Sequence, residues 1–412
     1  MQDNEKKPAL RFKGFTDPWE QRKLGELSRS FEYGLNAAAK EYDGQNKYLR
    51  ITDIDDTSRQ FVSADITSPD ANLAEADNYR LSDGDVLFAR TGASVGKTYL
   101  YKKSDGLVYF AGFLIRAKIK ESVSAGFIFQ NTLTRSYERY IAITSQRSGQ
   151  PGVNAQEYAE YQLMLPELFE QEKIAKLLEA LDTLITLHQR KYEKLVNIKK
   201  SMLDKMFPKN GASVPEIRFK GFTDLWEQRK LGDVADIVGG GTPSTNNPNY
   251  WDGDIDWYAP AEIAGQIYFD SSQRKITEQG YENSSAKMLP PGTVLFTSRA
   301  GIGKTAILSK KGCTNQGFQS IVPHNDELDS YFVFSRTDEL KQYGELVGAG
   351  STFVEVSGKQ MAAMNLKMPT TIEEQQTIGR FFKRLDTLIT LHQRKLEKLQ
   401  NIKKSCLEKM FV

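Results

Sequence analysis

The sequence predicts an α/β (α+β) chain in which two long antiparallel helices join two mixed α/β domains and form an intramolecular coiled coil with pseudo-two-fold symmetry. Three observations predict this fold. The eleven residues LDTLITLHQRK occur at 181–191 and again at 385–395, 204 positions later. Each copy lies in a long helical pattern with an apolar stripe. Between the repeated segments, the two halves of the chain share only short islands of sequence.

The repeat forms a frame around the dissimilar segments. Residues 11–27 and 218–234 differ at three of seventeen positions, and residues 181–206 and 385–410 differ at four of twenty-six. Self-similarity of this kind indicates a duplicated architecture. We therefore expect two equivalent scaffolds with different variable faces: a first domain at 1–168, a helix at 169–207, a linker at 208–217, a second domain at 218–371 and a second helix at 372–412.

Each helical pattern places its pairing residues at alternating steps of three and four, as in a heptad seam. The predicted pairing residues are Leu181, Leu184, His188, Leu195, Leu385, Leu388, His392 and Leu399. A helix of roughly 37 residues would be about 55 Å long and unstable alone, so each helix needs the other. The short linker keeps the second domain near the end of the first helix, and the helices are therefore expected to be antiparallel.

His188 and His392 fall in the middle of this seam. A polar residue there commonly fixes the register of a coiled coil, and a pH sensor or ligand pair is the alternative. Basic residues follow each histidine. They are interpreted as a solvated helix face, with contact to phosphate or to an acidic protein as the alternative.

Composition describes an ordinary globular protein. The chain has 412 residues, 39% of them hydrophobic, and a net charge of +2, so composition alone does not indicate a nucleic-acid partner. No run approaches the roughly 18 apolar residues of a membrane span. Cys313 and Cys406 are too few for a disulfide framework or a cysteine metal site. We expect a cytoplasmic protein without a membrane contact, a metal or a cofactor.

Two strand-like runs, 85–90 and 293–299, mark equivalent places in the variable segments. Each ends in an arginine, Arg90 or Arg299, and leads through a glycine-containing loop to a lysine, Lys97 or Lys304. The glycine spacing does not fit a nucleotide-binding P-loop. We interpret the pattern as an arginine closing a strand, glycines that let the backbone approach a polyanion, and a lysine, at equivalent positions in both halves. Ordinary turn chemistry is the alternative.

Three further pairs of loops carry polar residues that can read base edges or hold phosphates. They are 30–36 and 239–245, 48–53 and 255–260, and 146–152 and 348–352. The candidate DNA contacts from these loops and the strand ends, together with Gln316, are Tyr33, Asn36, Arg50, Arg90, Thr91, Lys97, Arg147, Gln150, Thr242, Ser244, Trp257, Arg299, Lys304, Gln316 and Ser351.

The order of these landmarks, with the turns LPELFEQ at 165–171 and MPTTIEEQ at 368–375 and the two long helices, resembles the specificity subunit of type I restriction-modification systems over essentially the whole chain. The resemblance implies two target-recognition domains, each reading one half of a split target in double-stranded DNA. It also implies that the helices act as a spacer and dock two methyltransferase subunits, which restriction subunits join. The segment EYGLN at 32–36 departs from the family's usual Gly-Thr-Pro turn.

The sequence contains no recognisable catalytic set. The dipeptide Pro290-Pro291 precedes Gly292 and not the aromatic residue of an adenine-methylation loop. We therefore expect a non-catalytic subunit. Two alternatives are an ATP-binding enzyme, tested by substitution of Lys97 and Lys304, and a coiled-coil scaffold with two protein-binding heads, tested by selection of bound DNA.

Overall fold

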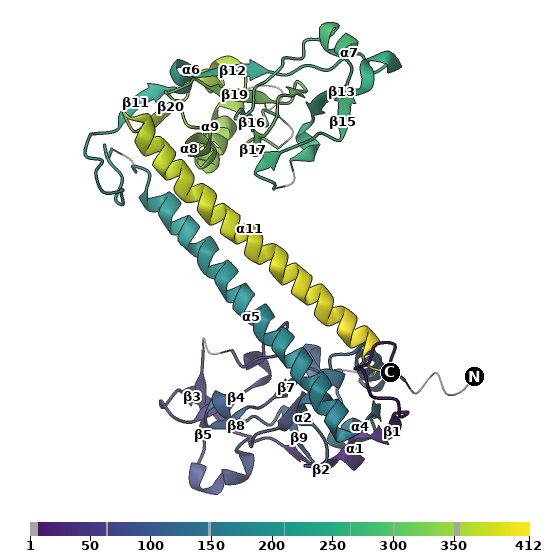
Figure 1. The fold of residues 1–412 in the computed structure, drawn as a ribbon. Helices are drawn as coiled ribbons and strands as arrows, with labels where there is room; N and C mark the ends of the chain where they lie inside the picture. Colours follow the sequence, from purple (N-terminus) through teal and green to yellow (C-terminus); the bar gives the residue numbers. More distant parts are fainter. Residues whose placement is uncertain are drawn as a thin grey trace. The chain divides into compact units, whose positions relative to one another are not determined.

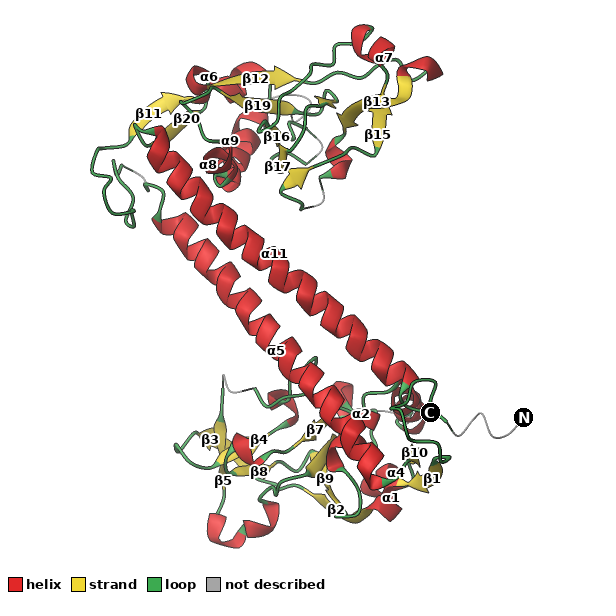
Figure 2. Cartoon of the chain, in the orientation of Figure 1, coloured by secondary structure: helices red, strands yellow, loops and turns green. Residues whose placement is uncertain are grey.

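The computed structural model describes residues 7–62, 65–146, 150–209, 211–263, 265–299, 301–349 and 355–412. The chain forms two compact units: unit 1 comprises residues 1–191 and 392–412, and unit 2 comprises residues 192–391. Each unit contains one mixed α/β domain and a part of each long helix (Figures 1 and 2). The predicted fold class, with two mixed α/β domains and two long helices, is confirmed.

Unit 1 is built around a four-stranded sheet in the order β2-β9-β6-β7. The strands of this unit are β1 (Glu20–Lys23), β2 (Ser28–Tyr33), β3 (Ala38–Glu41), β4 (Lys47–Leu49), β5 (Thr67–Asp70), β6 (Asp85–Ala89), β7 (Thr98–Leu100), β8 (Val108–Phe110), β9 (Leu114–Ile119) and β10 (Gln162–Leu165). The helices are α1 (Leu24–Leu27), α2 (Ala125–Asn131), α3 (Arg135–Thr144), α4 (Ala155–Ala159) and the long α5 (Leu168–Lys205). β1 pairs with β10, β3 with β5, and β4 with β8.

Unit 2 repeats this plan with the sheet β12-β19-β16-β17-β14. Its strands are β11 (Glu227–Lys230), β12 (Ala235–Gly239), β13 (Trp251–Tyr258), β14 (Tyr268–Phe269), β15 (Arg274–Ile276), β16 (Val294–Phe296), β17 (Thr305–Leu308), β18 (Cys313–Thr314), β19 (Gln319–Pro323) and β20 (Asn365–Met368). The helices are α6 (Leu231–Val234), α7 (Glu278–Glu282), α8 (Ser330–Phe334), α9 (Thr337–Gly348), α10 (Gly358–Ala362) and the long α11 (Ile372–Lys409). β11 pairs with β20, and β13 pairs with β15 and β18. The order of strands and helices therefore resembles that of unit 1, although unit 2 has the additional helix α7 and a fifth strand in its main sheet.

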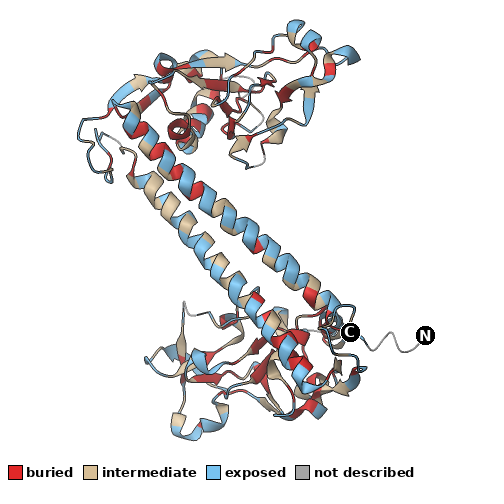
Figure 3. Ribbon diagram, viewed as in Figure 1, coloured by how far each residue is buried: buried red, intermediate tan, exposed pale blue. Residues whose placement is uncertain are grey.

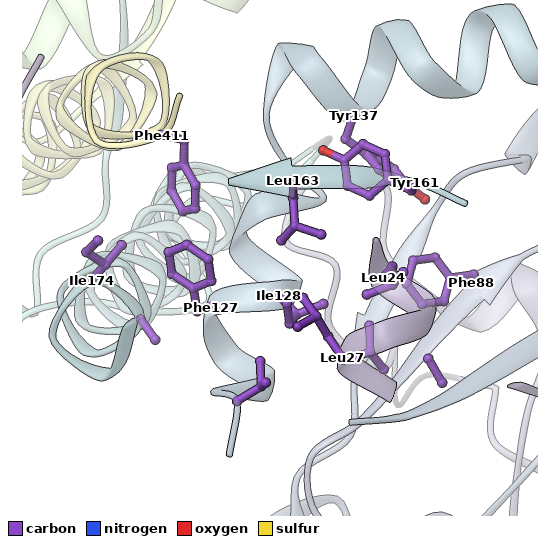
Figure 4. Packing of buried hydrophobic residues seen from close by; sticks show 14 of the residues in the cluster. Leu24, Leu27, Phe88, Phe127, Ile128, Tyr137, Tyr161, Leu163, Ile174 and Phe411 are labelled. Carbon is purple, nitrogen blue, oxygen red and sulfur yellow. The ribbon is translucent and has the colours of Figure 1, made fainter. Parts of the chain in front are cut away.

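The core of unit 1 joins the sheet to the long helices. Phe88 of β6 lies 4.7 Å, between ring centroids, from Tyr158, and Phe127 of α2 lies 5.2 Å from Phe411 near the end of α11. Figure 4 shows Ile174 of α5 facing Phe127 and Phe411. Burial of these aromatic and aliphatic side chains fixes the domain to the helix pair.

The same ion pair anchors each domain to its long helix. Arg11 donates two hydrogen bonds to the buried Glu170 carboxylate, at 2.7 and 2.8 Å. Arg218 makes the equivalent pair of bonds with Glu374, both at 2.7 Å. The next helical residue is a glutamine in both copies, and its side chain binds a backbone N–H of the domain: Ser124 for Gln171 in unit 1, and Asp329 for Gln375 in unit 2. The repeated frame is therefore also a repeated set of contacts.

The two long helices pair antiparallel inside each unit. In unit 1, His188 lies next to His392 and Asp182 next to Lys403, so residue numbers rise along α5 as they fall along α11. The Asp182–Lys403 ion pair at 2.5 Å has a counterpart in unit 2, where Lys199 contacts Asp386 at 2.5 Å. Two lysines of the predicted solvated face, Lys199 and Lys403, therefore form contacts between the helices.

The seam differs from the predicted one at two positions. Leu181, Leu385 and Cys406 are buried, and Leu195 and Leu399 pack at the edges of the two cores. Leu184 and Leu388, however, are 43% and 41% exposed, and their prediction as pairing residues is wrong. The seam instead passes through half-buried Ile185 and Ile389 and through Phe382 and Leu396, which are 0% and 9% exposed. Figure 3 shows that the buried residues of α5 lie in its first part, within residues 170–181, whereas α11 has buried residues at intervals along its length.

The histidine pair lies in the seam of unit 1. The Nδ1 atoms of His188 and His392 are 2.8 Å apart, which is a hydrogen-bond distance when one ring is the donor and the other the acceptor. The pKa of His392 is lowered by burial and by the positive charge of His188, Lys191 and Lys395. A hydrogen-bonded pair of side chains in the seam supports the predicted role in fixing the register.

None of the helices in the described part of the chain has a stretch long and apolar enough to span a bilayer.

Candidate nucleic-acid interface

Three neighbouring strand ends meet at one edge of the main sheet in unit 1: the end of β2, the start of β9 and the end of β6. Backbone hydrogen bonds continue beyond the strands. The Gly34 N–H donates to the Leu114 carbonyl at 3.1 Å, and the Arg90 N–H donates to the Phe113 carbonyl at 3.0 Å. The three loops are therefore held against one another by their backbones.

Unit 2 repeats the second of these hydrogen bonds, and a further one at the same strand end, between different residues. Ser298 takes the place of Arg90, and its N–H donates to the Gly317 carbonyl at 2.8 Å. The carbonyl of Ser298 accepts from Val356 at 2.9 Å, as the carbonyl of Arg90 accepts from Val153 at 2.9 Å. The backbone framework of the loops is thus shared by the two units, and the side chains on it are not.

A glycine occupies the closest backbone approach in both frameworks. A Cβ atom on Gly34 would lie 2.1 Å from the Ala111 carbonyl oxygen, and a Cβ atom on Gly240 would lie 2.0 Å from that of Asn315. No side chain fits at such distances. The loop EYGLN, which departs in sequence from a Gly-Thr-Pro turn, therefore has its glycine at the same place as the loop GGGTP of unit 2.

A buried aromatic side chain donates a hydrogen bond to a backbone carbonyl of each of these loops. The Tyr48 hydroxyl donates to the Leu35 carbonyl at 2.7 Å, and the Trp257 indole N–H donates to the Gly241 carbonyl at 2.8 Å. Trp257 is 5% exposed and packs edge to face on Trp251. The prediction that Trp257 contacts DNA is therefore wrong in this structure, because its ring and its N–H group are already used inside the domain.

The structure brings four predicted residues of unit 1 together. The Arg90 guanidinium lies over the Tyr33 ring, 5.1 Å from its centroid. Thr91 forms an isolated bridge with Gly152, which brings exposed Gln150 to the end of β6. Asn36 is also exposed, two residues after the close approach at Gly34. Arg147 lies outside the described residues.

Two predicted cations of unit 1 are neutralised within the chain. Arg50 is half-buried, and its guanidinium donates to both carboxylate oxygens of Asp53, at 2.8 and 2.9 Å. Lys97 is 8% exposed; its ammonium contacts Asp56 and donates to the Ile54 carbonyl at 3.1 Å. The contact with Lys97 lowers the pKa of Asp56. Lys97 is therefore not placed to meet a phosphate, contrary to the prediction.

In unit 2, Thr242 and exposed Gln316 are joined by a side-chain hydrogen bond. Exposed Ser244 lies two residues further along the same loop, and its carbonyl accepts from the Trp251 indole at 3.2 Å. Arg299 is half-buried and Lys304 is exposed. Ser351 lies outside the described residues.

The two arginines that follow the strand-like runs are not equivalent. The Ala89 N–H donates to the Lys97 carbonyl at 2.8 Å, and the Thr297 N–H donates to the Lys304 carbonyl at 3.0 Å, which aligns the lysines. Arg90 then corresponds to Ser298, so Arg299 lies one position further along. The predicted equivalence is therefore wrong for the arginines, and the aligned lysines differ in exposure.

Helix packing explains the glycine that precedes each lysine. A Cβ atom on Gly96 would lie 2.6 Å from Ile141 of α3, and one on Gly303 would lie 2.3 Å from the Lys341 side chain of α9. Both glycines also have a positive φ, 82° and 94°. These glycines are needed for the close packing of the loop on a helix, and no approach to a polyanion is required to account for them.

The chemical groups at the strand ends are donors and acceptors of hydrogen bonds. Among the described residues, no three histidine, cysteine or acidic side chains are grouped so that they could hold a metal ion. Burial raises the pKa of Cys313 to about 11, so its thiol is protonated at neutral pH. The exposed groups are amides, hydroxyls and a lysine, and the arginines are half-buried; all of these can donate to phosphates and base edges.

One exposed residue at this edge, Phe113, is not among the contacts predicted from the sequence. Phe113 is 63% exposed, in the turn that connects β8 to β9. In the sequence it lies between two apolar runs and reads as part of a buried strand. The only local signal was the preceding Gly112, which marks a turn.

Comparisons with known proteins identify the family. The family described as "Type I restriction modification DNA specificity domain" matches residues 16–197 and 223–401. The MjaIX specificity subunit of a type I restriction enzyme of Methanocaldococcus jannaschii is 34% identical over 190 residues, 45% of this chain and 44% of that protein. This chain thus spans less than half of that relative.

Other similarities cover nearly the whole chain. The putative MjaX specificity subunit of the same organism is 24% identical over 399 residues, 94% of this chain and 91% of that protein. The crystal structure of a type I restriction-modification S subunit from M. genitalium has the same fold, with a TM-score of 0.66 and 13% identity over 98% of this chain and 99% of that one. The chain belongs to the family of type I restriction-modification DNA specificity domains.

Proposed function

We propose that this chain is the DNA recognition subunit of a type I restriction-modification complex and that each unit reads one half of a bipartite target. One observation carries the proposal. The two units hold their strand-end loops with the same backbone hydrogen bonds but present different side chains on them. A shared framework with different side chains is what two readers of unlike half-sites need, since base edges are distinguished by side-chain chemistry.

The proposed contacts are the accessible members of the predicted set. In unit 1 they are Tyr33, Asn36, Arg90, Thr91 and Gln150, and in unit 2 they are Thr242, Ser244, Arg299, Lys304 and Gln316. Arginine suits the acceptor pair of guanine, and asparagine or glutamine suits adenine. Arg50 stays in the set as a half-buried cation whose charge is shared with Asp53. Arg147 and Ser351 stay predictions.

The long helices are proposed to set the distance between the half-sites and to dock two methyltransferase subunits, which restriction subunits then join. Exposed leucines support docking: Leu184 and Leu187 are 43% and 45% exposed, and their copies Leu388 and Leu391 are 41% and 43% exposed. Two copies of one apolar surface suit two copies of one partner. The chain itself is proposed to be non-catalytic and cytoplasmic.

The target is tested by mapping methylated bases in the DNA of a host that expresses the chain with its methyltransferase subunits. We expect one bipartite motif with a spacer of fixed length. A scaffold with two protein-binding heads predicts no motif that depends on this chain. Substitution of Gln316 by alanine supplies the control, because it should relax one half of the motif and leave the other unchanged.

The spacer is tested by insertion of seven residues after Gln189 and seven after Gln393, which preserves the heptad phase of both helices. Seven helical residues add about 10 Å, the rise of roughly 3 base pairs. We expect the spacer to lengthen by about that amount while both half-sites keep their sequence. An unchanged spacer would refute the proposed role of the helices.

A further inference from the structure

Phe113 is an apolar side chain held at the edge where unit 1 is proposed to read DNA. A single exposed hydrophobic residue is ordinary on a protein surface. Phe113 differs in its position, because it is 63% exposed between the ends of β2 and β6, which carry two of the proposed contacts.

The turn that carries Phe113 is held by backbone hydrogen bonds. The Leu114 N–H donates to the Ala111 carbonyl at 2.9 Å, and the Gly112 N–H donates to the Leu35 carbonyl at 2.8 Å. The Phe113 carbonyl itself accepts from Arg90 at 3.0 Å. Ala111 and Leu114 on either side are buried, at 7% and 0% exposure. The ring is therefore presented by a hydrogen-bonded backbone between two buried residues, and such preorganisation lowers the entropy lost on binding.

The surroundings of Phe113 are suited to DNA. Arg90, whose N–H holds the Phe113 carbonyl, has its guanidinium over the ring of Tyr33, 5.1 Å from the centroid. Tyr33 is fixed in turn, because its hydroxyl oxygen accepts from the Ala155 N–H at 3.3 Å. A cation that can meet a phosphate or a guanine thus lies on the strand end whose backbone is hydrogen-bonded to that of Phe113.

Unit 2 lacks the ring at the equivalent position. Its turn has Gly317 there, and a Cβ atom on Gly317 would lie 2.7 Å from Pro260. The preceding residue, exposed Gln316, carries the side chain of this turn instead and bonds to Thr242. The same backbone turn therefore presents an apolar ring in unit 1 and an amide in unit 2.

We propose that Phe113 is a specificity-determining residue of unit 1 that contacts the 5-methyl group of a thymine. The inference rests on the proposed function. A phenylalanine ring offers no hydrogen bond to a base edge, and the thymine methyl is the apolar group that the major groove displays. The two equivalent turns would then read the half-sites by different contacts. Phe113 of unit 1 would contact a methyl group, and the Gln316 amide of unit 2 would form hydrogen bonds.

The test uses the full chain assembled with its methyltransferase subunits and duplexes that carry the methylated motif. Each thymine of the motif is replaced in turn by deoxyuridine, which lacks only the methyl group, and the dissociation constant is measured. We expect one position at which the wild-type complex binds deoxyuridine about 4-fold more weakly, the equivalent of roughly 0.8 kcal/mol for one buried methyl group. In Phe113→Ala this ratio should fall to about 1.

The matched control is Leu225→Ala, which truncates a side chain that is 67% exposed in unit 2 and should keep the 4-fold ratio. The inference is overturned if no thymine of the motif is sensitive to deoxyuridine, if Phe113→Ala keeps the ratio, or if this variant fails to assemble with the methyltransferase subunits, which would make Phe113 a protein contact. Absence of any methylated motif in the wild type would instead refute the proposed function itself.

Discussion

The two units differ where they are proposed to touch DNA and agree where they hold themselves together. Both anchor an arginine to a buried glutamate at the start of a long helix, and both repeat an aspartate–lysine pair across the coiled coil. At the strand ends, Arg90 and Phe113 of unit 1 are replaced by Ser298 and Gly317 on the same hydrogen bonds. The comparison teaches that backbone contacts carry the shared architecture, so the side chains on the loops can change without loss of the fold.

The largest expected effect separates the two buried anchors. Arg11→Met leaves the Glu170 carboxylate, which is 0% exposed, without its cation and should destabilise unit 1 by about 3 to 5 kcal/mol. Arg218→Met should cost less, because Glu374 keeps a hydrogen bond from the Trp226 indole at 3.3 Å. Urea unfolding of each variant measures the difference. Equal losses would show that the indole bond does not distinguish the units.

The shared close approach is tested by Gly240→Ala, which places a methyl group on the Asn315 carbonyl and should destabilise unit 2 by about 2 to 3 kcal/mol. The neighbouring substitution Gly239→Ala is the control, since its Cβ atom meets nothing closer than 3.8 Å and the position is Tyr33 in unit 1. Thermal unfolding should separate the two variants clearly. Similar melting temperatures would contradict the proposed equivalence of Gly34 and Gly240.

Two substitutions on α11 test which of its leucines lie in the seam between the long helices. Leu396→Ala removes a side chain that is 9% exposed and should cost about 2 kcal/mol. Leu388→Ala removes one that is 41% exposed and should change the free energy of unfolding by no more than about 0.5 kcal/mol. The reverse order would restore the seam predicted from the sequence.

The smallest effect concerns pH and unit 1. Burial and nearby positive charge lower the pKa of folded His392 below the ordinary 6.5. The unfolded chain therefore binds more protons near that pH, and the stability contributed by neutral His392 is present above pH 6.5 and lost as the pH falls below it. We expect the double variant His188→Asn/His392→Asn to lose less stability than the wild type between pH 7 and pH 5. The free energy of unfolding is measured for both proteins across this pH range. Equal losses of stability would exclude the histidine pair as the cause of the pH dependence.

The sequence predicted the two long helices and the segments repeated before each domain, because these segments occur twice in the chain with nearly identical residues. It predicted six of the eight seam residues and was wrong at Leu184 and Leu388. Apolar residues are adjacent there, Leu184 with Ile185 and Leu388 with Ile389, and a seven-residue repeat does not choose between neighbours. The loops were harder. Lys97 and Lys304 have the same local pattern, but Asp56 and the Ile54 carbonyl, which hold Lys97, lie more than 40 residues away. Such long-range partners decide whether a loop cation is free.

The most direct test of the central claim exchanges one reader for the other. Residues 235–364, between the repeated frame segments of unit 2, are replaced by residues 28–161 of unit 1, and methylated bases are mapped in a host that also expresses the methyltransferase subunits. We predict a motif whose two halves are one sequence in inverted orientation, as an antiparallel frame with two identical readers requires. A motif that keeps both original halves would contradict the account.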